Sequence, residues 1–363
     1  MRDRSTRLHG VVSENPAVTV ELGLDTFGDR SADLSGAPVS YADSIRNVVE
    51  QGVLADRVGV DAFGVGEHHR DDFAVSAPEI VLAAIASRTE RIRLGTAVTV
   101  LSSDDPVRVF EKFATLDAVS RGRAEIVVGR GSFTESFPLF GFDLADYEVL
   151  FEEKLDLLHR LLAEGPVTWQ GTVRPGLTAH EVYPKTEAGL RVSVGVGGSP
   201  ESVVRAARYG FPLTLAIIGG EPARFAPYVE LYHRALAQLE QPDLPITVHS
   251  PGFIADTDQE AVDLLWPHQK AMFDRIGRER GWPPQSRDRF EEEVAHGAQH
   301  TGSPETVARK IAHTVRSLGV QRFDLKYTAG TLPHEHQMHA IQLYGDVVIP
   351  RVRELLAAGE GAG

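Results

Sequence analysis

The chain of 363 residues contains no cysteine, no run of lysine or arginine and no long apolar run. Without cysteine, disulfides, thiolate catalysis and cysteine-ligated metals are excluded. Without a long apolar run there is no membrane-spanning segment, and residues 1–17 lack the apolar core of a signal peptide. We therefore expect a soluble cytoplasmic protein with no membrane partner, a disordered extension over residues 1–17 and a flexible tail over 358–363.

The balance of charge is acidic, with 37 Lys and Arg against 51 Asp and Glu and a net charge of −14. Binding to nucleic acid depends on basic side chains that neutralise phosphates, so we expect no nucleic-acid partner. Apolar residues make up 42% of the chain, which is enough for a large core. The length is within the range that α/β barrels reach as a single domain.

Short apolar or β-branched segments alternate with longer segments of helical periodicity. The expected strands are residues 19–24, 62–66, 91–98, 123–129, 191–196, 212–218, 246–254 and 322–327. Apolar residues recur on one helical face at Phe151, Leu155, Leu158 and Leu162, and again at Ile341, Val348, Val352 and Leu355. Strands that alternate with helices predict a parallel sheet, and eight such units predict an α/β protein with a (β/α)8 TIM barrel over residues 18–357.

Three segments exceed what a minimal barrel needs. Residues 130–145 form an aromatic, glycine-containing loop after the fourth strand, and residues 164–190 contain "PVTWQGTVRP", which predicts a hairpin before the fifth. Residues 279–300, after the seventh strand, are polar and interrupted by proline. Loops that follow strands lie on the catalytic face of a barrel, so we expect the first segment to line a pocket and the third to act as a lid.

The stretch "FGVGEHHRDDF", residues 63–73, places Glu67, His68 and His69 directly after a short buried strand. Adjacent strand residues point to opposite faces, so only one of the two imidazoles would face a ligand. A pair of histidines in a solvated loop is the alternative. A metal-dependent barrel hydrolase would favour His-x-His on one strand, and we expect no metal site here or at "HEHQMH" (334–339), which predicts a solvated helix start.

Two copies of Gly-Ser-Pro-Glu occur, at residues 198–201 and 302–305. Each predicts a helix start, with Ser199 or Ser303 as N-cap and proline at the first helical position, and capping alone explains both. Only the first copy directly follows an expected strand. Its free N–H groups, together with Gly197, would suit a phosphate, although the carboxylate of Glu201 counts against an anion there.

Arg130 ends the fourth expected strand, whose carboxyl end lies beside that of the fifth in a barrel. Its guanidinium is therefore a candidate ligand for the same phosphate. A surface ion pair with Glu135 or Asp143 is the alternative role for this arginine.

Four segments together resemble the bacterial luciferase-like flavin-dependent monooxygenases. They are "GVGEHHRDDF", "RLGTAVTVLSSDDPVRVFEKFATLDAVSRGRAEIVVGRGSF", "GVGGSPESVVRAARYGFPL" and "TGSPETVARKI". Their elements occur in the family order, and the resemblance extends from about residue 20 to 357. It implies a (β/α)8 barrel that holds reduced FMN, or in some branches coenzyme F420, at the carboxyl ends of the strands.

The resemblance also implies roles for particular residues. It assigns His68 to the flavin ring and its reaction with oxygen, with His69 and Glu67 as supporting catalytic residues. Ala97 and Val98 match a position where many members have a cis peptide against the ring. The residues implied in phosphate binding are Arg130, Ser132, Gly197, Gly198, Ser199 and Ser202, although the family often has more polar residues at the two glycine positions. Ser102, Ser103 and Asp104 are candidates for contact with substrate or flavin.

The implied activity is oxidation of a small organic substrate with reduced FMN and O2, with His68 as a general acid/base whose pKa lies near cellular pH. No Gly-x-Gly-x-x-Gly fingerprint opens a βαβ unit, so reduced flavin is expected to reach the chain by diffusion from a separate flavin reductase. The family commonly dimerises, so a homodimer is expected. The alternatives are F420-dependent hydride transfer on the same barrel and a flavin-binding protein without catalysis.

Overall fold

The computed structural model describes residues 20–131 and 133–360. The extension expected over residues 1–17, Ser132, and residues 361–363 of the expected tail lie outside the described residues. The last helix, α12 (Ile349–Glu360), includes the remainder of that tail.

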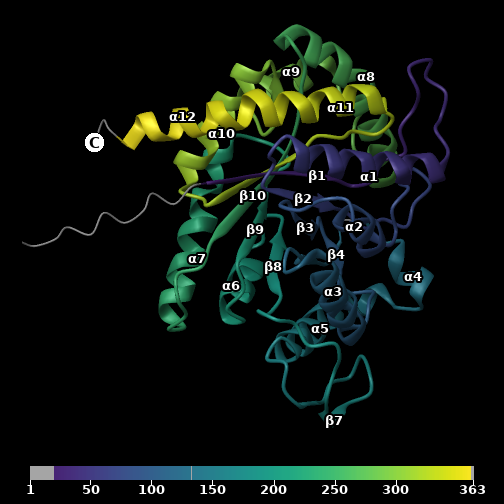
Figure 1. Cartoon of the computed structure of the whole chain (residues 1–363), viewed down its shortest axis with the longest axis vertical. Helices are drawn as coiled ribbons and strands as arrows, with labels where there is room; N and C mark the ends of the chain where they lie inside the picture. Colours follow the sequence, from purple (N-terminus) through teal and green to yellow (C-terminus); the bar gives the residue numbers. More distant parts are fainter. Residues whose placement is uncertain (1–19, 132, 361–363) are drawn as a thin grey trace, which may run out of the picture.

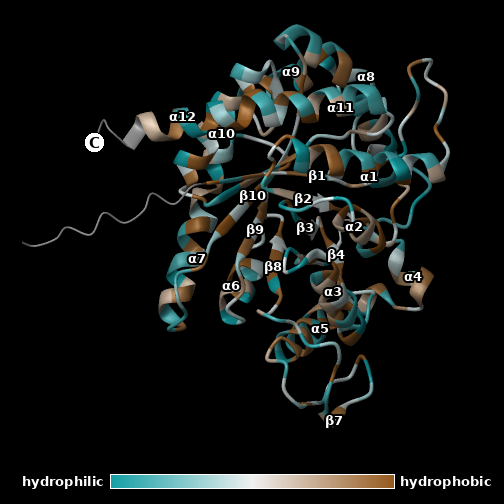
Figure 2. Ribbon diagram, in the orientation of Figure 1, coloured by the Kyte–Doolittle hydropathy of each residue, from teal (hydrophilic) through white to brown (hydrophobic). Residues whose placement is uncertain are grey.

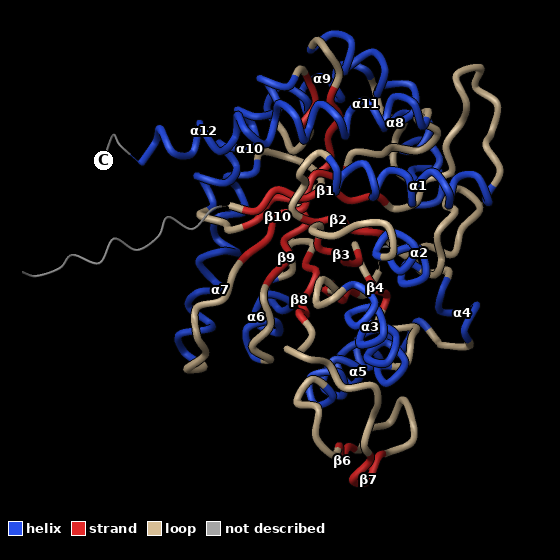
Figure 3. The backbone as a smooth tube through the Cα atoms, in the orientation of Figure 1, coloured by secondary structure: helices blue, strands red, loops and turns tan. Residues whose placement is uncertain are grey.

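The described strands form a 10-stranded parallel sheet that closes on itself (Figures 1 and 3). Its strands are β1 (Glu21–Thr26), β2 (Ala62–Val65), β3 (Arg93–Thr96), β4 (Thr99–Val100), β5 (Glu125–Gly129), β8 (Arg191–Val196), β9 (Leu213–Ala216), β10 (Ile246–Ile254), β11 (His300–Gly302) and β12 (Arg322–Lys326). Strands β3 and β4 are two parts of one segment, and a parallel bridge between Leu94 and Ala124 joins β3 to the β5 segment. Since β11 pairs only with β10, the ring has eight members, and the predicted barrel is confirmed.

Helices cover the outside of this barrel (Figure 1). The main ones are α1 (Tyr41–Arg57), α2 (Pro78–Ala86), α3 (Pro106–Ser120), α5 (Tyr147–Leu161), α6 (Pro200–Arg208), α7 (Ala226–Gln238), α10 (Pro304–Leu318) and α11 (His334–Leu343). Side-chain caps explain where several begin. Ser40 accepts a hydrogen bond from the N–H of Asp43, and Asp105 accepts from the N–H of Val107, so orphan donors of the first turn are satisfied.

The predicted C-terminal apolar face is divided between two helices. A π-helical segment, Tyr344–Val348, joins α11 to α12. Ile341, Val348 and Val352 are nevertheless fully buried, because the segment keeps all three turned toward the barrel.

Two of the three insertions lie where the sequence placed them. After β5, residues 130–145 contain α4 (Ser136–Phe140) and a short 3-10 helix, Leu144–Asp146. Before β8, strands β6 (Val167–Trp169) and β7 (Leu177–His180) pair antiparallel, so the predicted hairpin is confirmed.

The third insertion is larger than the expected residues 279–300. It begins with α8 (Asp258–Arg280), continues through α9 (Arg287–His296) and ends with β11, before α10 returns the chain to the barrel. Figure 1 shows α8 and α9 beside α11 at one end of the molecule. The expected bounds of the third insertion were too narrow, because α8 has the periodicity of an ordinary barrel helix. Only the polar turn after α8 departs from that pattern.

Apolar side chains fill the space between the barrel and its helices, and Figure 2 shows hydrophobic and hydrophilic residues alternating along the outer helices. In α5, Phe151, Leu155 and Leu158 are buried, which confirms the predicted one-faced helix. None of the described helices combines the length and the apolar character needed to cross a bilayer.

Leu158→Ala is expected to lower the free energy of unfolding by about 2–5 kcal/mol, since this leucine is 0% exposed and its removal leaves a cavity. Leu139→Ala, at a leucine that is 61% exposed, is the control and is expected to change stability by about 0.5 kcal/mol or less. Urea unfolding followed by circular dichroism measures both. Equal losses for the two variants would contradict the packing of α5 described above.

Candidate active site

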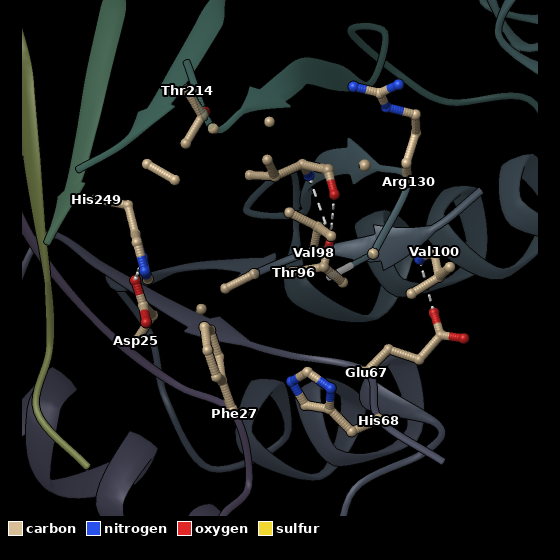
Figure 4. Close-up of a pocket in the computed structure, with 18 of the residues that line it drawn as sticks. Asp25, Phe27, Glu67, His68, Thr96, Val98, Val100, Arg130, Thr214 and His249 are labelled. Atoms are coloured by element: carbon tan, nitrogen blue, oxygen red, sulfur yellow. Dashed lines mark hydrogen bonds and ion pairs between the residues drawn. The ribbon is translucent and has the colours of Figure 1, made fainter. Parts of the chain in front are cut away.

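A cavity of about 340 Å³ opens at the carboxyl ends of the barrel strands. Every strand of the eight-membered ring contributes to its lining, and so do the loops after β1, β2, β5 and β8. Figure 4 shows several of these residues around the cavity. This is the face on which barrel enzymes bind their ligands. The aromatic loop after β5 contributes Phe133 and Glu135, as predicted for the first insertion.

Four glycines on neighbouring strands make this cavity possible. Gly64, Gly95, Gly129 and Gly195 all line it, and Gly64 lies beside Gly95 in the register of β2 and β3. A Cβ atom at Gly129 would lie 2.7 Å from a methyl carbon of Val98. Barrel interiors are normally filled by inward-facing side chains. Because these four residues have no side chain, the interior stays open toward the carboxyl ends of the strands.

His68 lies in this cavity among three aromatic rings. Its ring centroid is 4.1 Å from that of Phe73, 5.1 Å from that of Phe27 and 5.3 Å from that of Phe133. Its Nε2 atom is buried without a hydrogen-bond partner among the described residues. Burial lowers the pKa of His68 to about 3, so the imidazole is neutral at cellular pH.

One expectation for the histidine pair is wrong: the pKa of His68 does not lie near cellular pH, because burial disfavours the charged ring. Both histidines contribute to the lining of the cavity, but their rings have different neighbours, since His69 bonds Glu67 and contacts the ring of Phe140. Strand β2 ends at Val65, three residues before His68, so strand alternation does not extend to this pair.

Glu67 connects the loop after β2 to the segment that follows β3. One carboxylate oxygen accepts a hydrogen bond from the N–H of Val100 at 2.9 Å (Figure 4). The other lies 2.9 Å from Nε2 of His69. Both Glu67 and His69 are thereby held in place by the fold. The expected cis peptide between Ala97 and Val98 is present, and both residues line the cavity.

At another edge of the cavity, Arg130 lies beside the start of α6, as predicted. Its Nη2 donates to the hydroxyl of Ser202 at 3.1 Å. Ser199 is the N-cap of α6 and accepts from the N–H of Ser202, while Gly197 lines the cavity directly. Gly198 has a φ of +100°, a backbone conformation that favours glycine.

The partner of Arg130 differs from the sequence expectation. The guanidinium pairs with Glu148 at the start of α5, whereas Glu135 pairs with Arg70. A second arginine that sequence reasoning missed, Arg205, donates to Ser202 at 3.5 Å and to Glu148 at 3.1 Å. The sequence did contain an indication of Arg205, since this arginine lies six residues after the N-cap Ser199 on the same helix.

The second Gly-Ser-Pro-Glu copy has a different environment. Contrary to expectation it also follows a buried strand, β11, but this strand lies outside the barrel ring. The N–H of Ser303 donates to the Asp258 carboxylate at 2.7 Å, so a side chain already occupies the anion position.

Ser102, Ser103 and Asp104 do not line the main cavity. Ser103 and Asp104 line a separate cavity of about 200 Å³, in which Asp104 pairs with Lys112 at 2.9 Å. Ser102 is fully buried, and its carbonyl accepts a hydrogen bond from Lys154 at 2.6 Å. The predicted direct contact of these three residues with substrate or flavin does not fit this placement, because they follow the end of β4 and none of them lines the main cavity.

The floor of the cavity carries charged residues that sequence reasoning missed. The Nδ1 atom of His249 lies 2.6 Å from the Asp25 carboxylate, and both side chains are buried (Figure 4). Burial alone would lower the pKa of His249, but Asp25 outweighs burial and raises it. Beside them, burial raises the pKa of Asp324 to about 6. Charged residues inside expected strands were the signal, since they mark inward-facing positions that are not filled by apolar side chains.

Among residues 20–131 and 133–360, no group of three or more His, Asp or Glu side chains is arranged to hold a metal ion.

Comparison with known proteins agrees with this geometry. The model of the luciferase-like monooxygenase family matches residues 21–322. The chain belongs to the luciferase-like monooxygenase family.

Two curated relatives are similar over part of the chain. The 4-hydroxyprotoasukamycin monooxygenase of Streptomyces nodosus subsp. asukaensis is 35% identical over 169 residues, which are 45% of this chain and 45% of that protein. The limonene 1,2-monooxygenase of Rhodococcus erythropolis is 37% identical over 150 residues, 40% of this chain and 39% of that protein. The chain thus spans less than half the length of either relative.

Solved structures share the fold over most of the chain. The oxygenating constituent of 3,6-diketocamphane monooxygenase from Pseudomonas putida, a structure in complex with FMN, has a TM-score of 0.73 and 19% identity, and the match covers 92% of this chain and 99% of that one. An F420-dependent secondary alcohol dehydrogenase has a TM-score of 0.72 and 16% identity with the same coverage. At these identities the likeness establishes the barrel fold alone.

Asp25→Asn is expected to lower the pKa of His249 from above its usual value of about 6.5 to below it, because burial then acts without the opposing carboxylate. When the pKa of a histidine is higher in the folded than in the unfolded state, protonation of that histidine stabilises the folded protein below pH 6.5. This contribution is lost as the pH rises through the folded-state pKa. The stability difference between wild type and variant should therefore shrink from pH 6 to pH 8.

Histidine resonances followed by NMR from pH 5 to pH 8 measure this pKa directly. Asp243→Asn, which removes the carboxylate partner of the surface residue His233, is the control and should leave His249 unchanged. A His249 that is already neutral at pH 6 in the wild type would refute the assignment of a charged pair.

Proposed function

We propose that this chain is a flavin-dependent monooxygenase that uses reduced FMN and O2 to oxidise a small organic substrate. The observation that carries the proposal is the unpartnered, buried Nε2 of His68 in a cavity that Arg130 also lines, where Arg130 donates a hydrogen bond to Ser202. An orphaned polar atom in a buried position implies a partner that the protein itself does not supply. A flavin offers polar ring atoms for His68 and a phosphate for the arginine.

The residues present fit such a cofactor. Arg130, Ser202 and the start of α6 would hold the phosphate, since a helix N-terminus and a guanidinium both favour an anion. The glycine-lined interior beside Ala97 and Val98 leaves room for a flat ring. When bound, the reduced flavin supplies the electrons and the ring that reacts with oxygen.

His68 would act as a neutral hydrogen-bonding group in this reaction. With a pKa of about 3 it stays uncharged, so its Nε2 either donates or accepts one hydrogen bond but does not bring a positive charge to the ring. The three aromatic neighbours exclude water from that side of the imidazole. Exclusion of water protects reactive intermediates in general, which makes these rings part of the catalytic arrangement.

Glu67 and His69 are proposed as positioning residues. The Glu67 carboxylate holds the backbone of Val100 and the ring of His69, so it fixes the loop that presents His68. A role in direct proton transfer is not needed to explain either side chain.

The third insertion is proposed as a cover for the cavity mouth. Arg70, in the loop after β2, is 6% exposed and pairs with Glu135 of the first insertion and with Glu279 at the end of α8. The loop after β2, the aromatic loop and the third insertion therefore meet at one guanidinium, which would couple any movement of α8 to the loop that carries His68.

The alternative function is F420-dependent hydride transfer on the same barrel, a cofactor that one structural neighbour uses. The acidic tail of that cofactor would favour basic residues beyond Arg130. Arg205 and Arg208 do lie there, but Glu152 pairs with both of them. Because the basic cluster is largely neutralised, we rank FMN first.

The remaining partners are also proposals. A separate flavin reductase would supply reduced FMN by diffusion, the protein would act in the cytoplasm, and a second copy of the chain would form a homodimer. Exposed apolar side chains on α2 and α3, Ile80 at 69% and Val119 at 50% exposed, are consistent with such an interface on that side of the barrel.

Reconstitution with FMN and with F420 tests the proposed function. We expect one FMN per chain, seen as a shifted flavin absorbance spectrum after gel filtration, and oxygen-dependent turnover once reduced FMN is supplied. F420 should leave no bound chromophore. Binding of F420 alone, with anaerobic turnover, would instead establish the alternative.

His68→Ala is expected to retain FMN binding within about threefold and to lower turnover by 10²-fold or more, because the variant loses the hydrogen bond at the ring but keeps the phosphate site. Isothermal titration and single-turnover kinetics measure the two quantities. His159→Ala, at a histidine that packs against Tyr209 and Phe211 outside the cavity, is the matched control. Unchanged turnover in His68→Ala would support a binding protein without catalysis at this site.

A further inference from the structure

One carboxylate lies between the two arginines of the proposed phosphate site. Glu148 pairs with Nη1 of Arg130 through one oxygen, and its other oxygen lies 3.1 Å from Nη2 of Arg205. Both guanidiniums also donate to the hydroxyl of Ser202, at 3.1 Å and 3.5 Å. The Glu148 carboxylate thus accepts hydrogen bonds from the same guanidinium N–H groups that would bind the phosphate.

The exposure of the three side chains is unequal. Glu148 is 63% exposed, whereas Arg130 is 25% and Arg205 is 13% exposed. The arginines are held by their surroundings, and the glutamate reaches them from solvent. Exposed ion pairs contribute little to stability, so the Glu148 side chain can leave at small cost.

A different carboxylate keeps Arg205 in place. Oε2 of Glu152 lies 2.7 Å from Nε of Arg205, and Oε1 of the same residue accepts from the hydroxyl of Tyr209 at 2.9 Å and pairs with Arg208. Glu152 is therefore the anchor of this arginine. Glu148 adds no such anchoring, since its other partner is Arg130, at the end of the neighbouring strand β5.

We propose that Glu148 is a built-in competitor for the cofactor phosphate, which lowers the affinity of the site for the dianionic monoester of FMN. The proposal rests on the proposed function and deepens it. A phosphate monoester carries about −1.5 to −2 charges at pH 7 and is repelled by a carboxylate at the same guanidiniums. A weakened phosphate site suits a flavin that is exchanged with a reductase in solution instead of being kept as a prosthetic group.

The alternative role is structural, with Glu148 required to orient both arginines. The two roles predict opposite effects of its removal. A competitor that is removed allows tighter binding of the phosphate, whereas the loss of an orienting group weakens it. The oxidised isoalloxazine ring is uncharged, so the charge of Glu148 should not change its binding. Riboflavin has this ring but lacks the phosphate, and it therefore separates effects on ring binding from effects on phosphate binding.

The test is Glu148→Gln, which keeps the size of the side chain and removes its charge, with Glu148→Ala as a second variant. Asp146→Asn is the matched control, because Asp146 lies two residues away, is exposed and has no side-chain partner among the described contacts. Binding of oxidised FMN and of riboflavin is measured by quenching of flavin fluorescence, and binding of inorganic phosphate by ³¹P NMR line broadening.

We expect Glu148→Gln to lower the Kd for FMN by about tenfold and to tighten inorganic phosphate, with riboflavin unchanged within about twofold. Asp146→Asn should change the Kd for FMN by less than about twofold. An unchanged or higher Kd for FMN in both Glu148 variants would overturn the proposal, as would an equal effect on riboflavin.

The phosphate measurement keeps the two proposals distinguishable. If the wild type binds neither flavin, the proposed function fails, and tighter inorganic phosphate in Glu148→Gln still supports the competitor role. If FMN binds and supports turnover but phosphate and FMN affinities do not respond to Glu148, the proposed function stands and the competitor role is wrong.

Discussion

The site depends on an interior that the barrel leaves unfilled. Most barrels of this kind pack their axis with branched side chains, but four neighbouring strands here carry glycine at the level of the cavity, at residues 64, 95, 129 and 195. The space is shaped from one side by Val98, which lies against two of these glycines. The ring of strands supplies rigidity, and the missing side chains supply volume.

Around this space the fold separates two kinds of electrostatic environment. His68 is surrounded by aromatic rings and is neutral, whereas His249 lies against a buried carboxylate and is favoured in its charged form. The pKa of the same residue type is therefore shifted in opposite directions at two positions of one cavity. Burial without a partner and burial with a partner account for the difference.

The outer part of the site is connected by charged side chains. Glu67 joins the loop after β2 to the segment after β3, and Arg70 joins that loop to both insertions. At the edge beside α6, Arg130 and Arg205 are arranged around one serine, and their partners are acidic residues of α5. An acidic chain can thus gather arginines locally, because each guanidinium responds to the charges nearest to it more than to the net charge.

The eight strands of the ring, the hairpin before the fifth strand and the helix start at Ser199 followed from the sequence, because local periodicity and capping are properties of neighbouring residues. Arg130 was expected beside the helix start at Ser199, because barrel order makes the carboxyl ends of consecutive strands adjacent. The extent of the third insertion, the partner of Arg130 and the pair of Asp25 with His249 were decided only by the tertiary structure. Contacts between residues 18 or 224 positions apart depend on how strands and helices pack, as does the burial that sets the pKa of His68, and no local pattern encodes them.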